Sequence, residues 1–160
     1  MTREEQLTAG LRDLYHKIAW LNGLKMKDCF DGYKSSEIHC VEFIGKNADS
    51  NVTKLAEAFY MTMGAVSKLT KKLIAKGLIV SYRKPENKKE LYFKLTDAGE
   101  SIYRTHENLH CEFANRDKCV FDETTAEEIA VMVNFTEKYS SHLDDEIKKL
   151  TTAAKEEQSE

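Results

Sequence analysis

Long apolar runs are missing from this sequence. No stretch of about 18 uninterrupted apolar residues occurs, so no transmembrane helix is expected, and the first residues, MTREEQL, lack the apolar core of a signal peptide. Both absences predict a cytoplasmic protein without membrane contact. The chain also has a single proline and seven glycines among 160 residues, with 41% hydrophobic residues, which is typical of a mostly helical globular protein.

Cysteine pairs and catalytic motifs are missing as well. No CxxC pair occurs, so we expect free thiols in a reducing cytosol rather than disulfides. The four cysteines are Cys29, Cys40, Cys111 and Cys119. The chain has no Gly-rich phosphate loop, no HExxH and no GxSxG motif. We therefore expect that the protein is not an enzyme.

Positive charge is concentrated in one segment of a chain that is acidic as a whole. The net charge of the chain is -3, yet residues 63–94 hold nine lysines and arginines against two glutamates, a net charge of +7, which leaves -10 for the rest. A basic segment on an acidic body is the charge distribution expected of a phosphate-binding face. A solvated helix face beside a solvated hairpin is the alternative.

Two short helices are predicted around the start of this basic segment. Asn51 is a suitable N-cap for an amphipathic helix over 52–59, and Thr62 is a suitable N-cap for a second helix. The second helix would run to Lys76 and end at Gly77, because glycine accepts the left-handed conformation that closes many helices.

A hairpin is predicted directly after the second helix. Two strand-like runs, 78–83 and 91–95, are separated by a lysine-rich tip over 83–90. Helix, turn, helix and hairpin in this order make up a winged helix-turn-helix. The expected fold is therefore mainly α with a small β wing.

Helices with apolar stripes flank this unit on both sides. The N-terminal stripe recurs at spacings of three and four residues: Leu7, Leu11, Leu14, Ile18 and Leu21. The C-terminal stripe does the same: Ile129, Met132, Phe135, Tyr139, Leu143, Ile147 and Leu150. A two-fold homodimer would bury both stripes, and a palindromic DNA site requires two copies of the binding unit. The alternative is that the two end helices pack on each other within one chain.

These elements divide the chain into four expected segments. Residues 1–34 form a dimerisation helix and a connection, and residues 35–96 form the winged helix-turn-helix. Residues 97–150 form long helices that complete the dimerisation region, and residues 151–160 form a frayed tail.

The second helix of the unit is expected to enter the major groove. Its apolar residues Val66, Leu69, Leu73 and Ile74 stand at helical spacing and should face the core, which turns the opposite face to DNA. On this helix we predict DNA contacts by Thr62, Met63, Ser67, Lys68, Lys71 and Lys72. On the wing, which would lie over the minor groove, we predict contacts by Arg83, Lys88 and Lys89.

Three stretches of the chain resemble the MarR family of winged-helix repressors. They are NVTKLAEAF at 51–59, MTMGAVSKLTKKLIAKGLI at 61–79 and LYFKLTDAG at 91–99. The resemblance runs from about 35 to 113 and extends more loosely over the whole chain. It implies a homodimer whose end helices pair and whose two winged units bind a palindrome.

The wing tip departs from the family pattern, which usually has Asp-x-Arg there. Asn87, Lys88 and Lys89 stand in its place. Lysine lacks the planar donor fork of arginine, so we expect weaker recognition of minor-groove shape and more general attraction to phosphates.

Two branches of the family share features with this chain. The stretch SSEIHCVEFIGKNADSNVT at 35–53 looks most like the branch that represses fatty-acid biosynthesis, which implies a small-molecule or acyl-type effector. The zinc-sensing branch has two histidines at the positions of His106 and His110, and a third that His39 matches approximately.

Histidines four residues apart share one helix face and can hold one metal ion. Together with the zinc-sensing branch, this spacing implies a zinc site formed by His39, His106 and His110. The alternative is that these histidines bind no metal and lie on the surface or in hydrogen bonds, and no cofactor is required by the fold.

The sequence thus predicts a sequence-specific DNA-binding transcriptional regulator, a ligand-responsive repressor that binds a palindromic operator as a dimer. Its expected partners are double-stranded DNA, a second copy of the chain and a small effector. Two alternatives stay open. One is a metal- or thiol-based sensor that acts through protein partners without DNA, and the other is a metal-dependent enzyme built on His106, His110 and Cys111.

Overall fold

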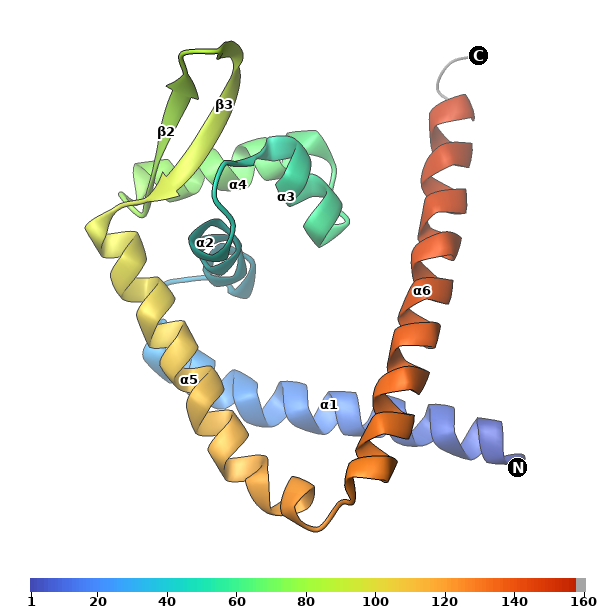
Figure 1. Cartoon of the computed structure of the whole chain (residues 1–160). Helices are drawn as coiled ribbons and strands as arrows, with labels where there is room; N and C mark the ends of the chain where they lie inside the picture. Colours follow the sequence, from blue (N-terminus) through green and yellow to red (C-terminus); the bar gives the residue numbers. More distant parts are fainter. Residues whose placement is uncertain (158–160) are drawn as a thin grey trace. The chain divides into compact units, whose positions relative to one another are not determined.

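A computed structural model describes residues 1–157 of the chain (Figure 1). The chain divides into two compact units, Met1–Phe113 and the part from Ala114 onward. The last helix continues to Glu157, past residue 150, where we expected it to end. Residues 158–160 of the expected tail lie outside the described residues.

The architecture is mainly α with a small sheet, as the sequence predicts. In chain order the elements are α1 (Arg3–Cys29), α2 (Ser35–Lys46), β1 (Ser50–Asn51), α3 (Val52–Phe59), α4 (Met63–Ala75), β2 (Ile79–Lys84), β3 (Asn87–Leu95), α5 (Asp97–Asp122) and α6 (Ala126–Glu157). Helices α2 to α4 followed by the β2–β3 hairpin form a winged helix-turn-helix, and Figure 1 shows the hairpin projecting away from α2.

The predicted caps fix where the two helices of the helix-turn-helix begin. The Asn51 side chain accepts a hydrogen bond from the Lys54 backbone N–H at 2.8 Å, and the Thr62 hydroxyl accepts one from Ala65 N–H at 3.2 Å. Each bond satisfies an N–H group that the first turn of a helix leaves without a partner. Gly77 adopts φ of 71° directly after α4, the left-handed conformation expected of a helix-ending glycine.

The sheet has three antiparallel strands in the order β1-β3-β2. Strand β1, only two residues long, pairs with β3 through Ser50 and Phe93, and sequence analysis did not predict it. The hairpin tip is also tighter than predicted. Strand β3 already begins at Asn87, so only Pro85 and Glu86 form the turn.

Helix α4 buries one face in the main core of the first unit. Val66 and Leu73 are fully buried there, next to Leu55, Ile79 and Phe93. The prediction that Ile74 faces this core is wrong, because its side chain is 40% exposed. One residue advances about 100° around a helix, so Ile74 lies past the edge of the face on which Leu73 is buried. Thr70 fills the inward position instead.

Thr70 can lie in the core because its hydroxyl has a partner. It donates to the Val66 backbone carbonyl at 3.1 Å, which satisfies a polar group that would otherwise be costly to bury.

Apolar side chains on the two end helices remain exposed within each unit. Helix α1 has no buried residue, and Leu7, Leu14 and Leu24 are each about half exposed. In the second unit, α6 likewise exposes Met132 and Leu143. Among the described helices, none combines the length and apolar character needed to cross a bilayer.

Candidate functional site

Helix α4 turns a basic face to solvent. Lys68 and Lys71 are exposed, as are Thr62 and Met63 at its N-terminus, while Ser67 is half-buried. Lys68 and Lys71 lie opposite Val66 and Leu73, given 100° per residue. Within the part of the chain that the structure describes, neither lysine has a carboxylate within ion-pair distance.

The remaining lysine of α4, Lys72, and the C-cap residue Lys76 are held by an acidic side chain of α2. The Lys72 ammonium lies 2.8 Å from Glu37 Oε1, and the Lys76 ammonium lies 2.9 Å from Glu37 Oε2. Lys72 was predicted as a DNA contact, and the structure places its charge in this ion pair. Glu37 was not among the predicted functional residues.

Glu37 is buried, with 1% of its side chain exposed. Burial alone would raise the pKa of Glu37, but the contacts with Lys72, with the Lys34 backbone N–H and with Lys76 outweigh burial and lower its pKa to about 2. The Lys34 N–H donates to Glu37 Oε2 at 2.8 Å. A buried carboxylate that accepts two hydrogen bonds and pairs with a second ammonium stays ionised at neutral pH.

The lowered pKa of Glu37 predicts that the free energy of unfolding decreases in acid. Because its pKa is lower in the folded chain than the ordinary 4.5, its ionisation stabilises the fold above about pH 4.5, and this stabilisation is lost as pH falls toward 2. The shift corresponds to about 3 kcal/mol, of which about 2 kcal/mol should be lost by pH 3. Urea unfolding at pH 7 and pH 3 should show that loss in the wild type and not in Glu37→Gln. Equal losses in both proteins would refute the assignment.

Asp49 binds two side chains of strand β2 in the wing. The Asp49 carboxylate accepts hydrogen bonds from Lys84 Nζ at 2.6 Å and from the Tyr82 hydroxyl at 2.7 Å. These contacts lower the pKa of Asp49, with Lys84 as the main cause. Lys84 is therefore neutralised within the protein.

At the wing tip, Arg83 differs in its role from Lys88 and Lys89. The Arg83 guanidinium donates to the Lys88 backbone carbonyl, which braces the turn and leaves its other N–H donors available. Lys88 and Lys89 are exposed, and their ammonium groups have no ion-pair partner among the described residues. With Lys68 and Lys71, they are the predicted DNA-contact lysines that have no carboxylate partner in the part of the chain that the structure describes.

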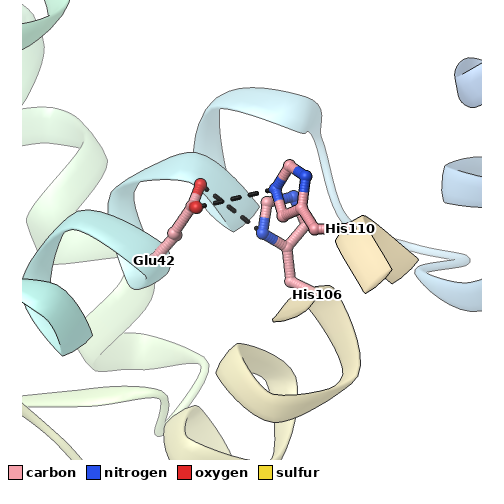
Figure 2. A group of neighbouring side chains, drawn as sticks. All are labelled: Glu42, His106 and His110. Atoms are coloured by element: carbon pink, nitrogen blue, oxygen red, sulfur yellow. Dashed lines mark ion pairs between the residues drawn. The ribbon is translucent and has the colours of Figure 1, made fainter. Parts of the chain in front are cut away.

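A second cluster of polar side chains lies where α2 meets α5. Figure 2 shows Glu42 of α2 facing His106 and His110 of α5. His106 Nδ1 lies 3.4 Å from Glu42 Oε2, and His110 Nε2 lies 3.6 Å from Glu42 Oε1. One ligand atom from each of the three side chains falls within 4.8 Å of the others, a separation compatible with one metal ion.

The charges around this cluster suit metal ligands. Burial lowers the pKa of His106, which keeps its ring neutral, the form that binds metals. The buried Nδ1 atom of His106 has no hydrogen-bond partner among the described residues. The pKa of Glu42 is lowered, because Lys46 and the two histidines outweigh its burial. Lys46 Nζ binds Glu42 at 2.6 Å, so a metal would have to displace this contact.

The third predicted ligand, His39, lies beside the cluster. Its ring centroid is 5.7 Å from that of His106, and its side chain is exposed, but the group within 4.8 Å contains Glu42 in its place. Glu42 follows His39 by three residues on α2, so both share one helix face. That spacing was the signal by which the sequence could have identified Glu42.

A cavity of about 600 Å³ opens beside this cluster, within the first unit. Its walls come from α1, from the α1–α2 connection, from α2 and from α5. They combine apolar side chains such as Met26, Phe30 and Leu109 with polar ones such as Asn22 and His39. A volume of this size with mixed walls can hold a small amphipathic molecule.

Comparison with protein families and curated proteins gives the following matches. A model of the MarR family matches residues 34–91. The uncharacterized HTH-type transcriptional regulator YhjH of Bacillus subtilis (strain 168) is 36% identical over 110 residues, which cover 66% of this chain and 63% of the relative. HTH-type transcriptional regulator PchR of the same organism is 33% identical over 111 residues, covering 69% of this chain and 66% of PchR. The matches thus span just under two thirds of either relative.

Solved structures share the fold at low sequence identity. FabT of Streptococcus pneumoniae in complex with DNA matches with a TM-score of 0.77 at 22% identity, covering 89% of this chain and 98% of FabT. The adhesin competence repressor AdcR of Streptococcus pyogenes matches with a TM-score of 0.65 at 20% identity, covering 89% and 98%. These structures confirm the expected winged helix-turn-helix architecture.

Proposed function

We propose that the chain is a member of the MarR family and a sequence-specific DNA-binding transcriptional regulator, from the family-model match over residues 34–91 and from the geometry of α4 and the wing. The observation that carries the proposal is the exposure of Lys68 and Lys71 on α4 and of Lys88 and Lys89 on the wing. These four exposed cations are not neutralised by carboxylates of the described chain. HTH-type regulators among its relatives and a DNA complex among its structural neighbours support the same proposal.

In the proposed complex, α4 lies in the major groove and the β2–β3 wing over the neighbouring minor groove. Thr62, Met63 and Ser67 lie near the N-terminus of α4, the part of a recognition helix that reaches base edges. Arg83 contributes its remaining donors at the wing. Phosphate contacts by the lysines supply affinity, and the contacts of α4 to base edges supply specificity.

The regulator is proposed to act as a homodimer, with residues 1–34 and 97–150 as its dimerisation region. The support is the half-exposed apolar stripe on α1, which includes Leu7 and Leu14, and the one on α6, which includes Met132 and Leu143. Contiguous exposed apolar surface of this kind marks an interaction site. A second copy is the proposed partner because two binding units match a palindromic operator.

Selection of bound duplexes from a random library tests this function. Wild-type protein should enrich a palindrome whose half-sites are centred about one helical turn, roughly 10 base pairs, apart. Sedimentation should give the mass of two chains on the enriched duplex. Failure to enrich any sequence at low salt, or binding as a single chain, would refute the proposal.

The cavity between α1, α2 and α5 is the proposed effector site. The cavity lies between α1 and the helices that carry the winged unit, so a bound ligand would change the spacing of the two DNA-binding units of a dimer. The regulator is proposed to be a repressor that such a ligand controls. Its mixed walls suit a small amphipathic effector, such as one with an acyl chain.

A second candidate for the effector is a divalent metal such as zinc, favoured by the separation of Glu42, His106 and His110. Zinc accepts carboxylate and imidazole ligands, and the neutral buried His106 is one such ligand. His39 lies near enough to take part if its side chain turns.

Metal binding can be tested with His110→Ala, because His110 is exposed and its loss should leave the fold intact. Calorimetric titration with zinc should show one site per chain in the wild type and an affinity reduced about 100-fold or more in the variant, since one of few ligands is gone. His142→Ala, which removes an exposed histidine of α6, should bind zinc as the wild type does. Equal affinities for all three proteins would exclude this site.

A further inference from the structure

Glu37 occupies an unusual place for a carboxylate. Among the described residues it is the one aspartate or glutamate that is buried, and it lies at the start of α2, against the C-terminal half of α4. Its two oxygens are divided between the ammonium groups of Lys72 and Lys76, at 2.8 and 2.9 Å. These lysines stand four residues apart and therefore lie on one flank of α4.

Lys76 is held by more than this ion pair. Its Nζ also donates to the Gly32 backbone carbonyl at 3.1 Å and lies 4.6 Å from the centroid of the Tyr33 ring. An ammonium has three N–H donors, so these partners occupy the group. Lys76 is thereby directed toward α2 and the α1–α2 connection.

The three lysines of α4 and its C-cap residue Lys76 thus form two pairs with different surroundings. Lys68 and Lys71 lie opposite the buried face of the helix, without a carboxylate partner among the described residues. Lys72 and Lys76 lie on the flank toward α2 and share the charge of Glu37. A lysine that contacts a phosphate releases a counterion and steepens the salt dependence of binding, whereas a lysine held by a buried carboxylate does not.

We propose that Glu37 is a specificity-determining positioning residue, which withholds Lys72 and Lys76 from the DNA backbone and so limits binding to non-operator sequences. This inference rests on the proposed DNA-binding function. Two lysines per subunit that were free to follow any phosphate would raise the affinity for every duplex, because phosphate contacts carry no sequence information. Held by Glu37, they leave discrimination to the N-terminal part of α4. In this arrangement Lys72 is not a DNA contact of the wild-type protein.

Glu37→Gln is the first test, measured with the selected operator and with a duplex of random sequence. The neutral amide keeps a side-chain oxygen for the Lys34 N–H and removes the charge that pairs with both lysines. Lys72 is thereby released, and Lys76 keeps only its contacts with Gly32 and Tyr33. Affinity for the random duplex should rise about 10-fold at about 50 mM salt, and the plot of log affinity against log salt should steepen by about 0.9 for each new phosphate contact. The ratio of operator to random affinity should fall.

Glu57→Gln is the matched control, because it removes the same charge from an exposed position on α3. It should leave the salt slope and the affinity ratio unchanged. A change equal to that of Glu37→Gln would show a general effect of net charge and overturn the proposal.

Lys72→Gln keeps the proposal testable if Glu37→Gln folds poorly, because Glu37 retains Lys76 in this variant. With Glu37 present, Lys72→Gln should leave the salt slope for DNA unchanged, whereas Lys71→Gln should reduce it. A reduction by Lys72→Gln as large as that by Lys71→Gln would overturn the proposal. Absence of duplex binding by the wild type would instead refute the DNA-binding function itself, so the two failures are distinguishable.

Discussion

Replacement of Lys68 by alanine is expected to weaken operator binding by about 30-fold or more. Lys68 is exposed on the solvent face of α4, in the second turn of the helix, where side chains reach base edges or phosphates. A loss of about 1 kcal/mol in each of two subunits corresponds to this factor. Fluorescence anisotropy with the selected duplex measures it. Thermal stability should not change, because the side chain packs on nothing in the core.

Lys138→Ala is the control for this variant. Lys138 is an exposed lysine of α6, outside the winged unit, so its loss removes the same charge from a part of the chain that is not proposed to touch DNA. Operator affinity should stay within about two-fold of the wild type. If Lys68→Ala binds as tightly as Lys138→Ala, α4 does not present the proposed face to DNA.

Replacement of Gly99 by alanine is expected to destabilise the first unit by about 3 kcal/mol. Gly99 is buried in the first turn of α5, and a Cβ atom built there would lie 2.0 Å from the Leu78 carbonyl oxygen. That carbonyl already accepts the Thr96 backbone N–H at 3.1 Å. The Cβ position is fixed by the backbone of α5, and the atom it meets is a backbone oxygen, so no rotation of a side chain can relieve the clash. The junction between α5 and the start of β2 must therefore shift.

Gly64→Ala is the matched glycine variant for this test. A Cβ atom on Gly64 would meet no atom within 4 Å, and Gly64 lies inside helix α4. Alanine should therefore stabilise the helix by about 0.5–1 kcal/mol. Urea unfolding of both variants measures the difference. A Gly99→Ala protein as stable as the wild type would show that α5 does not pack against Leu78 as described.

The helix-turn-helix could be predicted from the sequence because its signals are local. Asn51 and Thr62 cap their helices through bonds to N–H groups three residues away, and Gly77 ends α4 in a conformation that glycine favours. Such signals act within a few residues, and the chain carries them in the right order. The short strand β1 was missed because its pairing with β3, far along the chain, leaves no such local signal.

The burial of Glu37 and the cluster of Glu42 with two histidines were not predicted, because both depend on contacts between residues far apart in the sequence. A glutamate in the first turn of a helix is ordinarily exposed, and the sequence gives no sign that Glu37 would be buried. Its burial requires lysines 35 and 39 positions away to arrive at the same point. Glu42 joins His106 and His110 only because α2 meets α5 in the fold. Ile74 was assigned to the core by its apolar character, although Thr70 takes the inward position.

The most direct test of the account is the salt dependence of operator binding by the wild-type protein. Contacts by Lys68, Lys71, Lys88 and Lys89 from two subunits would give about eight phosphate contacts, so the plot of log affinity against log salt should fall with a slope of about -7. Anisotropy titrations between about 50 and 200 mM salt would measure this slope. A flat plot, or no binding to any duplex at the lowest salt, would contradict the account.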